Sequence, residues 1–276
     1  MKITFCSAIL LAASMAIFAS CGEGQGAEET KTDSTTIAQN TDTGSTQQDT
    51  IKIHGSIEFT AADGLVITAD SYEILPGEKY ILLCHQAGYS RGEYVETAKK
   101  LNEMGYNCLA IDQRSGEACN GVVNETARRA KEQKKKTGYL DAGQDIVAAI
   151  DYIYNHSQHP VVVVGSSYSA ALALKIAKNN NKVSAVAVFS PGEYLKGINL
   201  QKEISGLNIP VFATSSKEEA NDVATLLSGI ADDKKTLFAP SGAGDHGSQV
   251  LWESAPDHNE YWTAFSDFLD KVSTPQ

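Results

Sequence analysis

Apolar and polar residues follow two different spacings along the chain after residue 50. Short runs of consecutive apolar residues predict buried strands, and longer stretches with apolar residues three or four positions apart predict helices. The predicted strands are 80–84, 107–111, 161–164, 183–189, 210–214 and 236–238, and the predicted helices are 94–104, 140–154, 170–177, 218–227 and 261–272.

The first stretch, residues 51–73, alternates apolar and polar residues on both sides of Ala62-Asp63-Gly64, which predicts a β-hairpin. Strands that alternate with helices predict an α/β fold, with a mostly parallel sheet and helices on both faces, here preceded by the antiparallel hairpin. Residues 51–276 have the right length for one such domain. In a sheet of this kind, ligands bind beyond the carboxyl ends of the strands. Residues that follow predicted strands are therefore the first candidates for chemistry.

The most informative of these positions follows the strand 161–164. Four valines lead into Gly165-Ser166-Ser167-Tyr168-Ser169, and a helix comes next. A strand, a tight glycine-serine turn and a helix are the layout of a nucleophile elbow, which exposes a serine hydroxyl above the sheet. Ser167 lies at the apex of the turn and is the predicted nucleophile, with Ser166 and Ser169 as the alternatives.

A serine hydroxyl needs a base that removes its proton, and His246 is the predicted base. It lies in a glycine-rich segment, 241–247, after the last predicted strand. The unperturbed pKa of histidine lies close to neutral pH, which suits this role. His156 and His159 lie at a helix end, where they have the spacing of two metal ligands but lack a visible third. No metal site is therefore predicted.

The third member of such a set is a carboxylate that orients the histidine. Glu219 is the predicted acid, because it lies where the loop after the strand 210–214 should turn towards His246. Three other acids that follow predicted strands stay open as alternatives: Glu218, Asp222 and Glu193.

An acyl-transfer site also needs N–H donors for the oxygen that becomes negative in the transition state. The residue after the nucleophile, Tyr168, is expected to supply one from its backbone. The other is expected from His85-Gln86-Ala87-Gly88, the loop after the strand 80–84, with Ala87 as the first choice and Gln86 as the second. His85 itself is expected to position this loop rather than to act as the base.

The chain order of serine, acid and histidine, the loop 85–88 and the turn Ile111-Asp112-Gln113-Arg114-Ser115-Gly116 together resemble the α/β-hydrolase superfamily. The similarity is greatest to serine esterases of the dienelactone-hydrolase-like kind and covers residues 51–276. It implies the α/β-hydrolase fold, and hydrolysis of an ester, a thioester or an amide of a small molecule through an acyl-enzyme, without a cofactor. The sequence departs from the family pattern at Ser169 and Gln86, which replace glycines, and its acid is a glutamate rather than the commoner aspartate.

The first 20 residues carry a different signal. Lys2 precedes an apolar stretch that is short for a membrane span and typical of a signal peptide. Its end, Phe18-Ala19-Ser20-Cys21, resembles the lipobox of bacterial lipoproteins, which implies lipidation of Cys21 and a place in the cell envelope, on a membrane and outside the cytoplasm. Phe18 replaces the usual leucine, so ordinary secretory cleavage near Ala19 is the alternative. The polar residues 21–50 predict a disordered tether.

Charge and cysteine content narrow the possible partners. A net charge of −11 argues against a nucleic-acid partner, which would need a basic surface. One basic stretch, 128–136, is typical of a solvated face, and its functional alternative is contact with an anionic substrate or a lipid headgroup. The cysteines after Cys21 are odd in number and lack Cys-x-x-Cys spacing, which argues against a disulfide framework or a zinc site: Cys84, Cys108 and Cys119.

One long gap, residues 113–137, separates a predicted strand from the next predicted helix. A connection of this length is expected to be a loop over the rim of the site, where it would help to build the substrate pocket; loops of this length are often lids, and whether this one moves stays open.

Three functions remain open. The first is an ester hydrolase, the second a peptidase or acyltransferase with the same three residues, and the third a non-catalytic binding lipoprotein with this fold.

Overall fold

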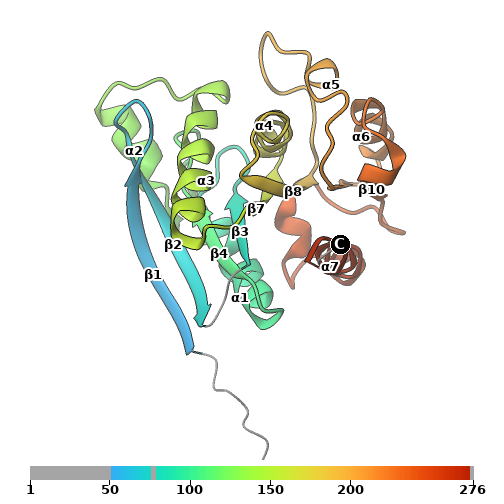
Figure 1. Cartoon of the computed structure of the whole chain (residues 1–276), viewed down its shortest axis with the longest axis horizontal. Coiled ribbons are helices and arrows are strands. Elements are labelled where there is room, and N and C mark those ends of the chain that lie inside the picture. Colours follow the sequence, from blue (N-terminus) through green and yellow to red (C-terminus); the bar gives the residue numbers. More distant parts are fainter. Residues whose placement is uncertain (1–50, 76–78, 274–276) are drawn as a thin grey trace, which may run out of the picture. The chain divides into compact units, whose positions relative to one another are not determined.

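The apolar runs of the sequence form one eight-stranded sheet in the computed structural model, which describes residues 51–75 and 79–273 (Figure 1). β1 and β2 form an antiparallel hairpin, β2 pairs antiparallel with β4, and the other pairings are parallel. The strand order is β1-β2-β4-β3-β7-β8-β9-β10. The strands are β1 (Ile51–Thr60), β2 (Val66–Leu75), β3 (Tyr80–Cys84), β4 (Asn107–Ile111), β7 (Val161–Ser166), β8 (Val183–Phe189), β9 (Val211–Thr214) and β10 (Lys235–Phe238).

Helices cover both faces of this sheet, as the alternating pattern predicts. Leu82 and Leu83 are neighbours in β3 and point to opposite faces, because side chains alternate along a strand. Leu82 belongs to the buried cluster that includes residues of α3, α4, α5 and α6, whereas Leu83 belongs to the cluster that includes residues of α1 and α7. The helices are α1 (Val95–Glu103), α2 (Glu125–Glu132), α3 (Gly143–Ser157), α4 (Tyr168–Ala177), α5 (Leu200–Glu203), α6 (Ala220–Leu226) and α7 (His258–Ser273).

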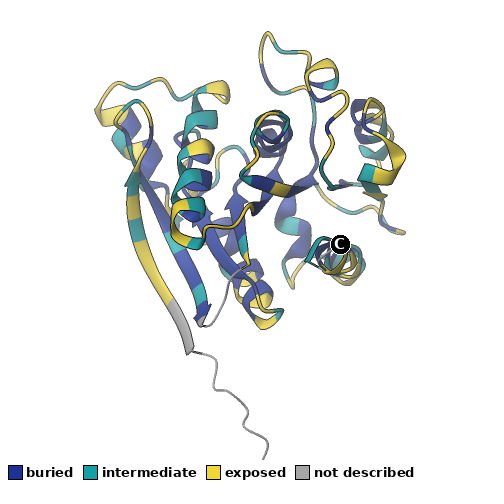
Figure 2. Ribbon diagram, viewed as in Figure 1, coloured by how far each residue is buried: buried dark blue, intermediate teal, exposed yellow. Residues whose placement is uncertain are grey.

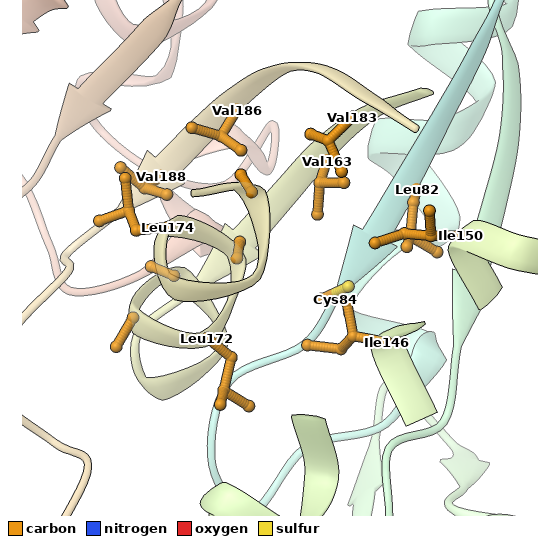
Figure 3. Packing of buried hydrophobic residues seen from close by; sticks show 14 of the residues in the cluster. Leu82, Cys84, Ile146, Ile150, Val163, Leu172, Leu174, Val183, Val186 and Val188 are labelled. Carbon is orange, nitrogen blue, oxygen red and sulfur yellow. The ribbon is translucent and has the colours of Figure 1, made fainter. Parts of the chain in front are cut away.

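The central strands are buried on both faces, which explains why they read as continuous apolar runs (Figure 2). Figure 3 shows Leu82 and Cys84 of β3 beside Ile146 and Ile150 of α3. Cys84, Cys108 and Cys119 are buried free thiols. The hairpin at the start and the helices on both faces confirm the predicted architecture.

The parallel strands end in register at one edge of the sheet. Gly165 pairs with Cys84, and the end of β7, Ser166, pairs with Phe189 at the end of β8. Phe189 pairs in turn with Thr214, the last residue of β9. The last residue of β10, Phe238, also pairs with Thr214. Segments that follow these strands therefore leave the sheet close together, and the predicted catalytic and oxyanion residues lie in such segments.

The prediction that residues 113–137 form a long loop without secondary structure is wrong. This part of the chain contains the two-stranded ribbon β5 (Ala118–Cys119) and β6 (Val122–Val123), followed by α2. Asn124 caps the helix by accepting a hydrogen bond from Ala127 N–H at 2.7 Å. The helix packs on β2 through small residues, which gave only a weak apolar signal in the sequence: Thr126, Ala127 and Ala130.

Ion pairs also hold the segment 113–137 in place. The guanidinium of Arg114, whose side chain is 1 % exposed, donates to Asp145 at 2.7 Å and to Asp63 at 2.8 Å. Arg128 pairs with acids of its own helix, and Arg129 reaches Glu58 on β1. Much of the basic stretch is thus engaged in intramolecular pairs.

The predicted signal peptide, the lipidation of Cys21 and the tether lie outside the described residues. Within the described part of the chain, none of the helices combines the length and the apolar character that crossing a membrane requires.

Candidate active site

The turn after β7 holds Ser167 in a strained conformation. Its φ and ψ are 56° and −119°, and its N–H donates to Phe189 O at 2.8 Å. A side chain at Gly165 would place its Cβ 2.6 Å from Ser169 O, so the close approach of strand and helix requires glycine there. Ser167 remains 8 % exposed on an otherwise buried turn.

Three predicted residues from three loops form one hydrogen-bonded row. His246 Nε2 lies 2.8 Å from the hydroxyl of Ser167, and His246 Nδ1 lies 2.5 Å from Oε1 of Glu219. The nucleophile follows β7, the acid follows β9, and the histidine follows β10. A hydroxyl, an imidazole and a carboxylate in this order can pass a proton from the hydroxyl to the ring while the carboxylate stabilises the resulting cation.

The carboxylate of Glu219 is held by more than the histidine. Its Oε2 accepts from Ser190 Oγ at 2.8 Å, from Ser216 Oγ at 3.1 Å and from Ser216 N at 3.2 Å. Burial raises the pKa of Glu219, but the hydrogen bonds from His246 and Ser190 outweigh it and bring the pKa to about 2. The hydrogen bond to Glu219 raises the pKa of His246, against the opposing effect of its burial.

The alternative acids have other partners or none near the ring. Glu218 and Asp222 are exposed beside Glu219. Both oxygens of Glu193 accept backbone N–H groups at the start of α5, at 2.7 and 3.0 Å. Asp245 accepts the N–H of its neighbour His246 at 2.7 Å.

The alternative serines of the turn are engaged in the protein interior. Ser166 Oγ accepts from Ser248 N at 2.8 Å, and Ser169 Oγ donates to His85 O at 2.6 Å. The hydroxyl of Ser169 thus joins the loop 85–88 to the turn after β7, at the position where the family pattern has glycine.

His85 is fully buried between the loops. Its Nδ1 donates to Gln86 O at 2.8 Å, which leaves Nε2 to accept from Gln113 N at 3.0 Å. Burial lowers the pKa of His85 to about 4, although the hydrogen bond from Nδ1 to Gln86 O opposes the shift. His85 therefore positions the loop, as expected. No three histidine, cysteine or acidic side chains are grouped to hold a metal within residues 51–75 and 79–273.

The two predicted oxyanion donors lie on segments that a hydrogen bond joins, from Ser169 Oγ to His85 O. Tyr168 is the first residue of α4, so its backbone N–H has no partner one turn earlier in the helix. Of the two candidates in the other loop, Gln86 already donates its N–H to Glu93 Oε2 at 2.8 Å. Ala87 is the next residue and is half-buried.

Two hollows flank the acid side of the row. One has a volume of about 420 Å³ between the loop after β8 and α6, and its lining includes Tyr194, Val223 and Leu226. The other is more open, with about 830 Å³, and reaches His246. The ring of Tyr194 meets the imidazole of His246 edge-on, with 6.5 Å between centroids. Neither of these two hollows is lined by the segment 113–137.

Sequence reasoning missed four polar residues that contact the row or its neighbours: Ser190, Ser216, Ser248 and Glu93. Ser190 directly follows the strand 183–189, so its place at the carboxyl edge was available as a signal. Glu93 and Ser248 gave no comparable signal, because neither follows a strand directly.

The geometry agrees with comparisons to known proteins. Residues 76–224, more than half of the chain, match the model of a hydrolase family described as serine aminopeptidase, S33. The chain belongs to this family. The expected membership in the α/β-hydrolase superfamily is thereby confirmed. None of the curated proteins compared with the chain matches it.

Solved structures share the fold at low sequence identity. An esterase of Pyrococcus furiosus is 15 % identical, with a TM-score of 0.61 over 80 % of this chain and 93 % of that one. A dienelactone hydrolase of Anabaena variabilis is also 15 % identical, with a TM-score of 0.61 over 80 % of this chain and 98 % of that one. A cold-adapted esterase from an Arctic intertidal metagenomic library is 18 % identical, with a TM-score of 0.56 over 83 % and 98 %.

Proposed function

We propose that this protein is a serine hydrolase that cleaves a carboxylic ester of a small molecule through an acyl-enzyme. The observation that carries the proposal is the row of contacts from Ser167 through His246 to Glu219, at 2.8 and 2.5 Å. The esterases and the dienelactone hydrolase with the same fold support the choice of bond.

In the proposed reaction, His246 takes the proton of Ser167 as its oxygen attacks the ester carbonyl carbon. The imidazolium then gives this proton to the departing alcohol, which leaves the acyl group on Ser167. Water attacks the acyl-enzyme, again losing a proton to His246, and the acid product leaves as Ser167 regains its proton. Glu219 stabilises the cation in both halves, because its hydrogen bond raises the pKa of His246.

The negative oxygen of each tetrahedral intermediate would accept the backbone N–H groups of Tyr168 and Ala87. Ala87 is preferred to Gln86 because the N–H of Gln86 is bound to Glu93. Loss of one such donor typically slows acyl transfer by about 100- to 1000-fold.

A fluorophosphonate probe tests the nucleophile directly, because it forms a covalent bond only with an activated serine. We expect wild-type protein and the control Ser184→Ala, an exposed serine on β8, to be labelled. Ser167→Ala should not be labelled. Labelling of Ser167→Ala at another serine would contradict the assignment, and an unlabelled wild type would favour the non-catalytic binding function.

Peptide hydrolysis is the second candidate, because the matching family model is described as a serine aminopeptidase. Both reactions use the same acyl-enzyme. Turnover of short-chain nitrophenyl esters together with inertness towards aminoacyl nitroanilides would support the esterase, and the reverse pattern would support the peptidase.

We also propose that a lipid on Cys21 anchors the protein in the cell envelope, which would place the site outside the cytoplasm. The lipobox-like end of the predicted signal peptide supports this proposal. Cys21→Ala should release a soluble protein with unchanged activity. Retention of that variant in the membrane fraction would contradict the anchor.

A further inference from the structure

Glu93 is a fully buried acid that the proposed reaction does not use. It lies in a short 3₁₀ helix, Arg91–Tyr94, between β3 and α1, with 0 % of its surface exposed. Burying a carboxylate without a cationic partner is costly. Among the described residues, Glu93 forms no salt bridge, so hydrogen-bond donors alone must satisfy its oxygens.

Those donors come from the two loops on either side of Ser167. Oε2 of Glu93 accepts from Gln86 N at 2.8 Å, in the loop that carries Ala87. Oε1 accepts from Ser248 Oγ at 2.6 Å, two residues beyond His246. One carboxylate therefore joins the loop of the proposed oxyanion donor to the loop of the proposed base.

The contact extends from Glu93 to the strand that carries the nucleophile. Ser248 N donates to Ser166 Oγ at 2.8 Å, next to Ser167. Gly247 has a φ of 78° and lies so close to Ser166 Oγ and the side chain of Gln86 that a Cβ would overlap with them. The backbone at Gly247 is thus packed tightly between the loop that contains Gln86 and the turn that contains Ser166.

We infer that Glu93 is a positioning residue: its carboxylate fixes the distance between the loop that carries Ala87 and the loop that carries His246. The inference rests on the proposed function, because it assigns those loops their roles. Misplacement of such groups by about 1 Å can cost on the order of 100-fold in rate. Because Glu93 contacts both the loop of the base and the loop of the oxyanion donor, its substitution can have a large effect on the rate.

The same carboxylate bears on the pH dependence. Burial raises the pKa of Glu93 to about 7, although the hydrogen bonds from Ser248 and Gln86 and the charge of His246 lower it. The ionised form in turn raises the pKa of His246. The other groups that interact with Glu93 are thiols and phenols: Cys84, Cys119, Tyr89 and Tyr94. Because the pKa of Glu93 is about 7 and its charge raises the pKa of His246, we expect both groups to lose their protons as the pH rises through the neutral range.

The first test is the rate of fluorophosphonate labelling between pH 5 and 9 in wild type and Glu93→Gln. This probe needs no knowledge of the substrate and reads the activation of Ser167. For wild type, we expect the labelling rate to increase with pH more steeply than the loss of one proton allows, because Glu93 and His246 both ionise; we call this rising part of the profile the acid limb. Glu93→Gln should be labelled on the order of 10- to 100-fold more slowly at pH 8. Its acid limb should have the slope of one proton and lie at lower pH, because the charge that raises the pKa of His246 is gone.

The second variant, Ser248→Ala, moves the limb in the opposite direction. It removes a donor that lowers the pKa of Glu93, so the acid limb should shift to higher pH. This variant keeps the buried carboxylate and serves if Glu93→Gln folds poorly. Glu103→Gln is the matched control, because it makes the same change at an exposed acid on α1 and should label like wild type.

Thermal unfolding separates positioning from folding. The pKa of the buried carboxylate is about 7 in the folded state and 4.5 ordinarily, so the unfolded chain releases this proton first and stability falls between about pH 4.5 and 7. The difference in Tm, Glu93→Gln minus wild type, should therefore increase from pH 5 to pH 7.5 and then level off, while the labelling rate of the variant stays low.

The outcomes distinguish this inference from the proposed function. A wild type that is not labelled at Ser167 contradicts the proposed function itself. If wild type is labelled but Glu93→Gln has the same rate, or is slower with an unchanged limb, Glu93 is no more than a structural residue and the inference is wrong. An unshifted limb in Ser248→Ala would overturn it as well.

Discussion

Two groups of hydrogen-bonded polar side chains in this protein differ in what surrounds their carboxylates. In the arginine cluster, Arg114 satisfies Asp145 and Asp63 with guanidinium N–H groups. In the serine cluster, formed by Ser167, His246, Glu219 and Glu93, the carboxylates accept hydrogen bonds from hydroxyls, backbone amides and an imidazole.

The difference decides which cluster can take part in chemistry. A guanidinium stays charged at every pH of interest, so the arginine cluster is fixed in one protonation state. An imidazole beside a carboxylate can gain and lose a proton near neutral pH. We therefore expect substitutions in the arginine cluster to change stability and substitutions in the serine cluster to change the rate of reaction.

The largest effect is expected from His246→Ala. Without the base, ester turnover should fall by about 10⁶-fold, while the melting temperature stays close to that of wild type. Hydrolysis of nitrophenyl acetate and a thermal melt provide the two measurements. His258→Ala, at the start of α7, is the control and should keep its activity. Comparable losses of activity in both variants would contradict the assignment of His246 as the base.

Glu219→Gln should lower turnover by about 10⁴-fold, because an amide holds the ring less well and does not stabilise its cation. Glu218→Gln makes the same change at the neighbouring exposed acid and should have little effect. Measurement of kcat/KM for both variants decides between the two acids. If Glu218→Gln proved the more damaging, the acid would have to be reassigned.

Asp145→Asn should destabilise the protein by about 3–5 kcal/mol, since it leaves the buried charge of Arg114 without its main partner. The free energy of unfolding in urea gives this value directly. Asp151 lies on the same helix as Asp145 and forms a half-exposed pair with Lys182. Asp151→Asn breaks this pair and should cost less than about 1 kcal/mol. Equal costs would mean that burial is not what distinguishes the arginine cluster.

The smallest effect concerns acid sensitivity beside the serine cluster. The pKa of His85 is about 4 in the folded protein and 6.5 for an unperturbed histidine. Below pH 6.5 the unfolded chain therefore binds a proton that the folded one does not, and stability falls until about pH 4. This group contributes at most about 3 kcal/mol of that loss.

Urea unfolding at pH 7 and pH 5 measures the effect. His85→Gln should flatten the difference between the two pH values, whereas His156→Gln, at the exposed end of α3, should leave it as in wild type. An undiminished difference in His85→Gln would assign the acid sensitivity to other groups.

The sequence predicted correctly those elements whose residues show a strong pattern of apolar positions, and it missed an element whose pattern is weak. The central strands were predictable because each is buried on both faces and reads as an apolar run, as in 161–164. Helix α2 was not, because its buried face consists of alanine and threonine and most of its other residues are charged. The segment 113–137 was therefore mistaken for a loop.

The elbow could be predicted from the sequence alone, because strand, turn and helix are contiguous and Gly165 is required by a contact within five residues. The fold class follows from the same kind of local information. The pairing of Ser167 with His246 and Glu219 spans loops after three strands, and only the register of those strands brings the loops together. The role of Glu93 is decided entirely by tertiary structure: burial and two donors, 7 and 155 residues away in sequence, give this carboxylate its place beside the serine that the elbow presents.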